Sequence, residues 1–207
     1  MREFITETPV ASFIFAITIA TSIYAFNNPS VFGKTMLHPY SVARGKNLST
    51  LITSGFVHKD YTHLIFNMLT FFFFGFSLEK WMSTFSSWGH IQFAALYIMG
   101  LVLSDLPTVQ KNKDNYGYHS LGASGAICAV LFSAILFQPK MMLGLFFIIP
   151  IPAWLFGILF LVYCSWAAKQ SPNGINHDAH YYGALVGLAV TIIMYPNIIP
   201  AVIQQFT

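Results

Sequence analysis

The segment LGASGAICAVLFSAILF (residues 121–137) has the apolar composition of a membrane-embedded helix and starts with a run of small residues. A lipid-facing helix is usually built from larger side chains, so this run predicts close contact with neighbouring helices. Within it, Ser124 lies between Gly122 and Gly125, where the apolar stretch begins. The role of a hydroxyl in that position has to be inferred from the rest of the chain.

The composition of the whole chain indicates a membrane protein. Of its 207 residues, 56% are hydrophobic and only 8% are charged, whereas soluble domains carry about a quarter charged residues. We therefore expect an all-α polytopic membrane protein forming a single domain over residues 1–207. The formal net charge is +3, but no basic cluster is dense enough to predict nucleic-acid binding. The partner that the composition predicts is the lipid bilayer.

Six apolar stretches approach the roughly 20 residues that a helix needs to cross a bilayer. They are Pro9–Phe26, Tyr61–Leu78, His90–Leu106, Leu121–Phe137, Met141–Ala167 and Ala179–Tyr195. None shows the alternation of a β-barrel strand, so the sequence predicts a bundle of six transmembrane helices. The second, fourth and sixth of these helices start on the same side of the membrane. The polar groups at their starts therefore share one leaflet.

Polar side chains at membrane depth are costly, which makes each of them a candidate site residue. His63 and Asn67 are four residues apart and lie on one helical face, as do His180, Gly183 and Gly187. The Gly183–Gly187 pair is a pattern that lets a neighbouring backbone come close. If it packs against the small residues around Ser124, His180 approaches Ser124.

A serine and a histidine in contact suggest nucleophilic catalysis. Serine is a weak nucleophile until a base takes its proton, and histidine can take that proton and return it to the leaving group. The backbone N–H groups of Ser124 and Gly125 at the helix start, with the side chains of His63 and Asn67, are candidate donors to an oxyanion. No acidic residue lies in the middle of a span, which favours a Ser–His dyad.

Other interpretations of these residues stay open at this point. His63 and Asn67 could instead tie the first loop to the second helix, and His58 is expected to anchor that loop or gate the site. The His177–His180 spacing suggests a metal, but no neighbouring Cys or intramembrane carboxylate completes a site, so we expect no metal. A small transporter or channel is a further alternative, although its polar residues should be spread through the membrane.

Three motifs, in order, resemble those of the rhomboid family of intramembrane serine proteases. They are HxxxxHxxxN (His58, His63, Asn67), GASGA around Ser124, and AHxxGxxxG from Ala179 to Gly187. The resemblance covers nearly the whole chain. It implies that Ser124 is the nucleophile, that His180 is the general base, and that His63 and Asn67 stabilise the oxyanion. It also implies that Gly122 shapes the loop before the serine, and that Gly183 and Gly187 pack helix six on helix four.

The resemblance further implies a cofactor-free endopeptidase that cleaves transmembrane protein substrates, with a catalytically inactive helix-binding protein as the alternative. It predicts a site on the extracytoplasmic side, whereas the basic residues favour the reverse orientation. The short chain favours a prokaryotic source, and so we expect a prokaryotic plasma (inner) membrane. Natural substrate and oligomeric state are not predicted. The chain departs from the family at Cys128, where relatives often carry an aromatic that packs on the catalytic imidazole. Tyr181 or Tyr182 is therefore expected to hold the His180 ring.

Overall fold

The computed structural model describes residues 2–145, 149–170 and 175–207. Its helices are α1 (Arg2–Glu7), α2 (Pro9–Phe26), α3 (Pro29–Thr35), α4 (Pro39–Val42), α5 (Thr50–Thr53), the 3₁₀ turn η1 (Ser54–Phe56), α6 (Tyr61–Phe85), α7 (Gly89–Asn112), α8 (Ser124–Phe137), α9 (Ala153–Ala167), α10 (His177–Met194) and α11 (Ile198–Phe206). Two strands, β1 (Met142–Leu145) and β2 (Ile149–Pro152), lie between α8 and α9.

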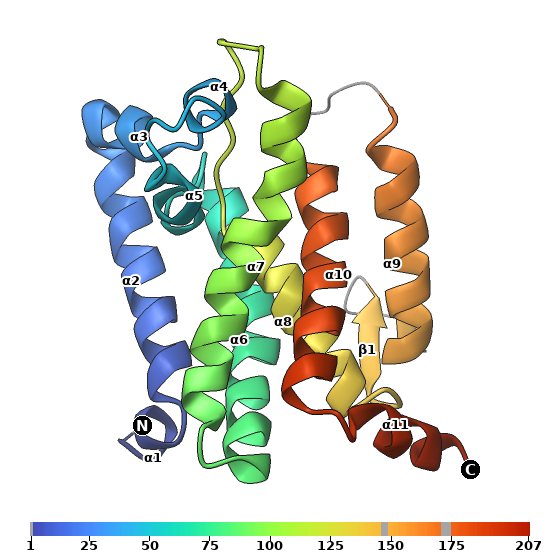
Figure 1. Ribbon diagram of the computed structural model, residues 1–207. Coiled ribbons are helices and arrows are strands. Elements are labelled where there is room, and N and C mark those ends of the chain that lie inside the picture. Colours follow the sequence, from blue (N-terminus) through green and yellow to red (C-terminus); the bar gives the residue numbers. More distant parts are fainter. Residues whose placement is uncertain (1, 146–148, 171–174) are drawn as a thin grey trace.

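The predicted bundle is confirmed: α2, α6, α7, α8, α9 and α10 are apolar helices that lie side by side (Figure 1). Three of them, α2, α6 and α7, are long and apolar enough to cross a membrane by themselves. The pair α10 and α11 passes the same test together but is bent by 104°. The helices α8 and α9 are apolar but shorter, with 14 and 15 residues.

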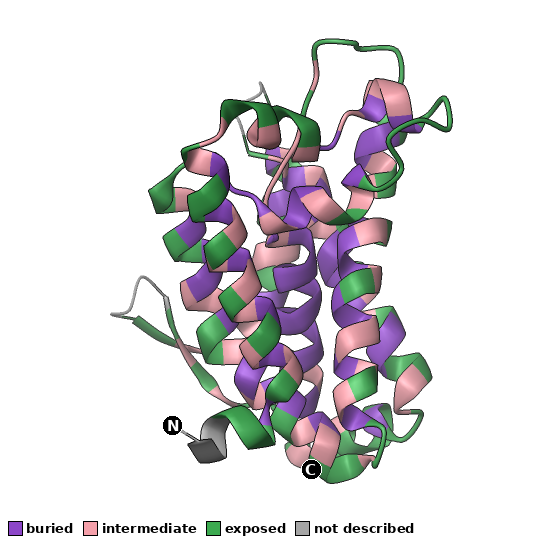
Figure 2. Cartoon of the chain, turned by 90° about the vertical axis from the view of Figure 1, so that its left-hand side faces the viewer, coloured by how far each residue is buried: buried purple, intermediate pink, exposed green. Residues whose placement is uncertain are grey.

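Helix α8 is the centre of the bundle. All of its residues except Ser124 and Leu136 are buried, and it packs against α6, α7 and α10. The buried residues form a continuous core through the middle of the bundle (Figure 2). A helix that is apolar all round and short needs protein on every side. The small residues of α8 thus serve helix packing, as the sequence predicted.

The fifth predicted span differs from the structure in its first part. Met142–Leu145 pairs with Ile149–Pro152 as an antiparallel ribbon in the register Met142↔Pro152, and the helix begins only at Ala153. Proline lacks the N–H that a helix interior requires, so Pro150 and Pro152 exclude a helix here, and the β-branched Ile149 and Ile151 favour a strand. Residues 146–148 of the predicted span lie outside the described residues.

A buried carboxylate ties three helices together near the end of α6 that is remote from Ser124. Glu79 is 0% exposed and accepts hydrogen bonds from the backbone N–H groups of Val10, at 3.1 Å, and Ala11, at 2.6 Å. His90 on α7 contacts the same carboxylate through Nδ1 at 2.6 Å. The first N–H groups of α2 have no acceptor within their own helix, so the Glu79 carboxylate serves as their acceptor. Its negative charge also complements the positive end of the α2 dipole.

We expect Glu79→Ala to lower the free energy of unfolding by about 2–4 kcal/mol, because it leaves buried donors without a partner. Thermal unfolding in detergent micelles measures the loss. The control is Glu7→Ala, which removes an exposed ion pair with Lys80 at 2.8 Å and should change stability by less than about 1 kcal/mol. Equal effects of the two substitutions would contradict the role of Glu79.

Candidate active site

The segment before Ser124 is held by the loop that joins α2 to α6. Leu37 and Ser120 exchange two backbone hydrogen bonds of 2.8 and 3.0 Å, and the N–H of Gly122 donates to the carbonyl of Ser54 at 2.9 Å. Gly122 has a φ of +115°, a left-handed conformation that favours glycine. This turn delivers Ser124 as the first residue of α8. The N–H groups at this helix start have no partner within the helix.

His58 anchors the same segment from a second side. Its ring is fully buried, and its Nδ1 lies 2.9 Å from the hydroxyl of Ser22 on α2. The N–H of Ala123 donates to His58 Nε2 at 3.5 Å, so Nε2 accepts and the ring is neutral. Burial lowers the pKa of His58 from 6.5 to about 3, and the nearby His63 adds to this shift. His58 therefore has the anchoring position that the sequence suggested.

We expect this histidine to make the fold sensitive to acid. In the unfolded chain the His58 pKa is near 6.5, whereas the fold lowers it to about 3. The unfolded state therefore binds a proton that the folded state resists, and the free energy of unfolding falls as the pH drops from about 6.5 towards 3. Thermal midpoints measured across this range should fall less steeply for His58→Gln than for the original chain. Parallel pH profiles would contradict the assignment.

His63 and Asn67 lie one turn apart on α6, next to the turn before Ser124. The carboxylate of Asp60 caps α6 by accepting from the His63 N–H at 2.7 Å. The ring of His63 packs against Gly122, where an added Cβ would come within 2.6 Å of its Cε1. His63 Nδ1 and Asn67 Nδ2 are buried and have no hydrogen-bond partner among the described residues. Buried polar atoms are normally paired, so these two remain candidate hydrogen-bond donors.

Helix α10 carries His180, and its start is positioned by Asn176. The side-chain oxygen of Asn176 accepts from the Ala179 N–H at 3.1 Å, while its Nδ2 donates to Thr108 on α7, at 3.0 Å, and to Ser120, at 3.3 Å. One amide thus joins the start of α10 to α7 and to the segment before Ser124. The sequence analysis missed this residue, although an asparagine directly before an apolar helix is a helix-capping signal.

The ring of His180 lies against Phe160 of α9. Their centroids are 6.5 Å apart with an interplanar angle of 28°, and His177 approaches edge-on at 5.9 Å. The rings of Tyr181 and Tyr182 pack on each other instead, with centroids 5.4 Å apart. The expectation that one of these tyrosines holds the His180 ring is therefore wrong. The aromatic contact comes from α9, a helix that sequence spacing cannot place beside His180.

Gly183 and Gly187 lie in direct contact with the backbone of α8. A Cβ added at Gly183 would clash with the carbonyl oxygen of Gly125, and one at Gly187 with that of Ala129. A hydrogen bond of 2.7 Å from Thr191 to Ser133 continues the same contact. The two glycines thus pack helix six on helix four, as expected. This contact brings the start of α10 close to the start of α8.

We expect Gly183→Ala to destabilise the protein by about 1–3 kcal/mol, because the added methyl group meets backbone that cannot rotate away. It should also reduce any activity that needs Ser124 beside His180. The thermal midpoint in detergent measures the first effect. The matched control is Gly33→Ala, since a Cβ at Gly33 meets nothing within 4 Å. Equal stability of the two variants would contradict a tight contact between α8 and α10.

The predicted site residues converge on one cavity of about 1070 Å³. Its lining includes Ser124, Gly125, His63, Asn67 and His180. In the described part of the chain, the Ser124 hydroxyl makes no hydrogen bond to His180. This does not exclude a catalytic pair, because hydrogen bonds between catalytic residues are often long in the absence of substrate. The structure therefore brings together the nucleophile, base and donor candidates from α6, α8 and α10.

From this polar end the cavity runs along α8 to the β-ribbon. Its walls are apolar and come mainly from α6 and α8, with two residues of α9 and with β1 at the far end: Phe66, Phe73, Ile127, Leu131, Phe156, Phe160, Met142 and Leu143. The cavity is thus a polar pocket at the start of α8 that continues into an apolar channel. An apolar polypeptide segment is a suitable occupant.

Cys164 of α9 is a neighbour of the histidines that the sequence analysis did not foresee. Its sulfur and ring nitrogens of His177 and His180 all lie within 4.8 Å of one another. No cysteine lies near these histidines in the sequence, and on that premise no metal was expected. In the fold that premise is wrong, because α9 packs against α10 and brings Cys164 to them.

Comparison with known families decides the classification of the chain. The family described as Rhomboid domain matches residues 45–197. The chain belongs to the rhomboid family. It is similar to RHOMBOID-like protein 12, mitochondrial, of Arabidopsis thaliana, with 30% identity over 176 residues, which are 78% of this chain and 50% of that protein. It is also similar to Rhomboid protein 1, mitochondrial, of Saccharomyces cerevisiae, with 31% identity over 150 residues, 67% of this chain and 40% of that protein.

These relatives correct one expectation about the rhomboid chain. Both carry the word mitochondrial in their names, so the predicted prokaryotic plasma (inner) membrane is wrong, while the multi-pass membrane location is supported. The prediction of a prokaryotic source rested on the short length of the chain. The chain spans half or less of the length of the two relatives, so its length carries no such information.

Proposed function

We propose that this rhomboid protein is an intramembrane serine endopeptidase that cleaves transmembrane segments of other proteins with a dyad of Ser124 and His180. One observation carries the proposal. Ser124, His180, His63 and Asn67 line the same cavity, although they come from three helices far apart in the sequence. His63 Nδ1 and Asn67 Nδ2 are in addition buried without a hydrogen-bond partner among the described residues. Packing alone does not require a serine, a histidine and two unpaired polar groups to converge on a cavity.

The arrangement suits acyl transfer through a covalent intermediate. The Ser124 Oγ attacks the scissile carbonyl while His180 takes its proton and then passes that proton to the leaving amine. The N–H groups at the start of α8, with Asn67 and His63, donate to the carbonyl oxygen as it becomes negative. A water molecule then attacks the acyl-enzyme with His180 again as base. These steps use the side chains and backbone of the site together with water.

The apolar channel supports a membrane-embedded substrate. Helix α9 forms one wall of it, and α9 is the least enclosed helix near the site, with Ala153, Gly157, Cys164 and Ala167 as its buried residues. Large apolar side chains such as Trp154, Ile158 and Val162 are exposed on its outer surface. A transmembrane segment that reaches the cavity past α9 therefore stays in contact with apolar surfaces. The names of the two relatives support a mitochondrial membrane as the location.

We expect Ser124→Ala and His180→Ala each to reduce cleavage of a transmembrane substrate in detergent by at least about 10³-fold. Labelling by a fluorophosphonate should disappear in Ser124→Ala. The matched control is Ser77→Ala, which removes an exposed hydroxyl on α6 that bonds to the carbonyl of Phe73 at 3.2 Å and should leave both readouts unchanged.

Two results would overturn this proposal. Normal cleavage by both dyad variants would exclude the mechanism. Absence of both cleavage and labelling in the unaltered chain would favour a helix-binding protein without catalysis. A transporter would be favoured by solute flux in liposomes that persists in Ser124→Ala.

A further inference from the structure

Three side chains of the types that bind transition metals meet between α9 and α10. They are Cys164, which is 1% exposed, His177, which is 5% exposed, and His180. Their ligand atoms, one sulfur and two ring nitrogens, all lie within 4.8 Å of one another. The proposed proteolysis uses His180 but not Cys164 or His177.

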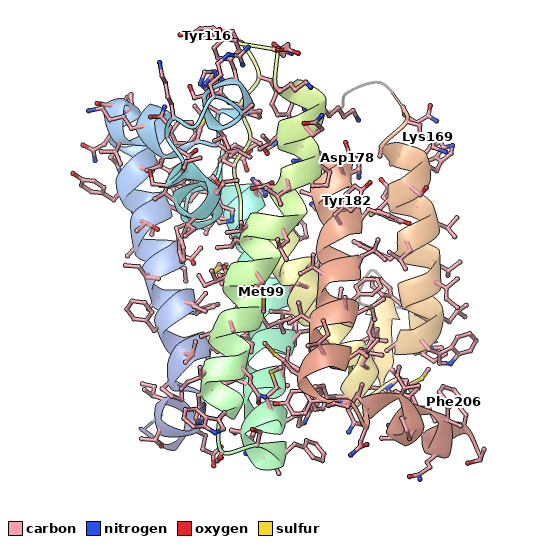
Figure 3. The ribbon with its side chains drawn as sticks, viewed as in Figure 1. Met99, Tyr116, Lys169, Asp178, Tyr182 and Phe206 are labelled. Atoms are coloured by element: carbon pink, nitrogen blue, oxygen red, sulfur yellow. The ribbon has the colours of Figure 1, made fainter. Side chains whose placement is uncertain are left out.

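The convergence follows from the helix arrangement. His177 and His180 are three residues apart, so they lie on the same face of α10, and their ring centroids are 5.9 Å apart. Cys164 comes from the last turn of α9, which packs against α10. Figure 3 shows Lys169, just after α9, and Asp178, in the first turn of α10, at the same end of the bundle. The cluster therefore links two helices that are separated by a loop.

The set of donors is suited to Zn²⁺. Zinc binds thiolate sulfur at about 2.3 Å and imidazole nitrogen at about 2.0–2.1 Å in a tetrahedron, so ligand atoms of a filled site lie about 3.3–3.6 Å apart. The observed limit of 4.8 Å exceeds this separation by about 1.2–1.5 Å, which side-chain rotation can close. Magnesium and calcium prefer oxygen ligands and are not suited to this cluster. Because His180 lines the cavity, a fourth ligand, such as water, has access to the ion.

We propose that Cys164, His177 and His180 form a binding site for Zn²⁺ or a similar divalent transition-metal ion, and that an ion bound there switches off His180 as a base. This inhibitory effect rests on the proposed proteolytic function, whereas binding of the ion does not. On binding, the Cys164 thiol gives its proton to solvent and the thiolate bonds to the metal.

The loss of the base follows from imidazole chemistry. A neutral imidazole has one nitrogen with a free electron pair, and its other nitrogen carries a proton. When the metal takes the free pair of His180, the remaining nitrogen is an N–H donor and cannot accept the proton of Ser124. The same ion joins α9 to α10, so it also restricts movement of the wall next to the apolar channel.

Binding is tested with Co²⁺ as an optical substitute for Zn²⁺, on the purified full chain in detergent. The unaltered protein should develop a thiolate-to-Co²⁺ charge-transfer band that Zn²⁺ abolishes. Cys164→Ser should lack the band, and Cys128→Ser, which removes the other buried thiol, should keep it. The thermal midpoints of the metal-free proteins check that both variants fold. Absence of the band in the unaltered protein, or its persistence in Cys164→Ser, would overturn the site.

The inhibitory effect is tested by titrating Zn²⁺ into a cleavage assay after chelator treatment. We expect Zn²⁺ to inhibit the unaltered protein, and Cys164→Ser to need at least about tenfold more Zn²⁺ for the same inhibition. Equal inhibition of both would overturn the switch. A Co²⁺ band in a protein that cleaves under no condition would support the metal site but contradict the proposed proteolytic function. Cleavage by a protein that shows no band would support the proteolytic function but contradict the metal site.

Discussion

The backbones of α8 and α10 touch at two points, and the position of the site depends on this contact. Gly183 lies against the carbonyl of Gly125, and Gly187 against that of Ala129. Apolar burial contributes little to helix association in lipid, so close van der Waals packing and the Thr191–Ser133 hydrogen bond hold the pair. His180 lies one turn before Gly183, and Ser124 directly precedes Gly125. The contact that packs the helices therefore also sets the separation of serine and histidine.

Polar groups near the site fall into two sets with different roles. His58 and Asn176 are hydrogen-bonded on both sides and fix the segment before Ser124 and the start of α10. His63 Nδ1 and Asn67 Nδ2 are buried without a partner in the described part of the chain. Leaving such a group unpaired costs about 1–3 kcal/mol. A substrate oxygen that accepts from them would recover this cost, most fully when it carries negative charge.

Helix α9 connects the proposed catalysis with the proposed control by a metal. It supplies Phe160, whose ring stacks on His180, and Cys164, whose sulfur lies near both histidines. It also forms one wall of the apolar channel and buries few of its own residues. His180, the proposed general base, thus lies between a tightly packed helix, α8, and a loosely packed one, α9. A ligand that ties α9 to α10 acts on the base and on the channel wall together.

The sequence alone was sufficient for the order of the apolar helices, except for the first part of the fifth, because apolar length can be read along the chain. Crossing parity also placed Ser124, His63, Asn67 and His180 towards one end of the bundle, where they line one cavity. The sequence also indicated that Gly183 and Gly187 pack against the small residues of α8. Only the tertiary structure placed Phe160 and Cys164 beside His180 and made Asn176 a link between α7, α10 and the serine segment. Those contacts join separate helices, and their geometry depends on how far each helix is rotated and shifted against its neighbour. The spacing of residues along one helix does not determine that rotation.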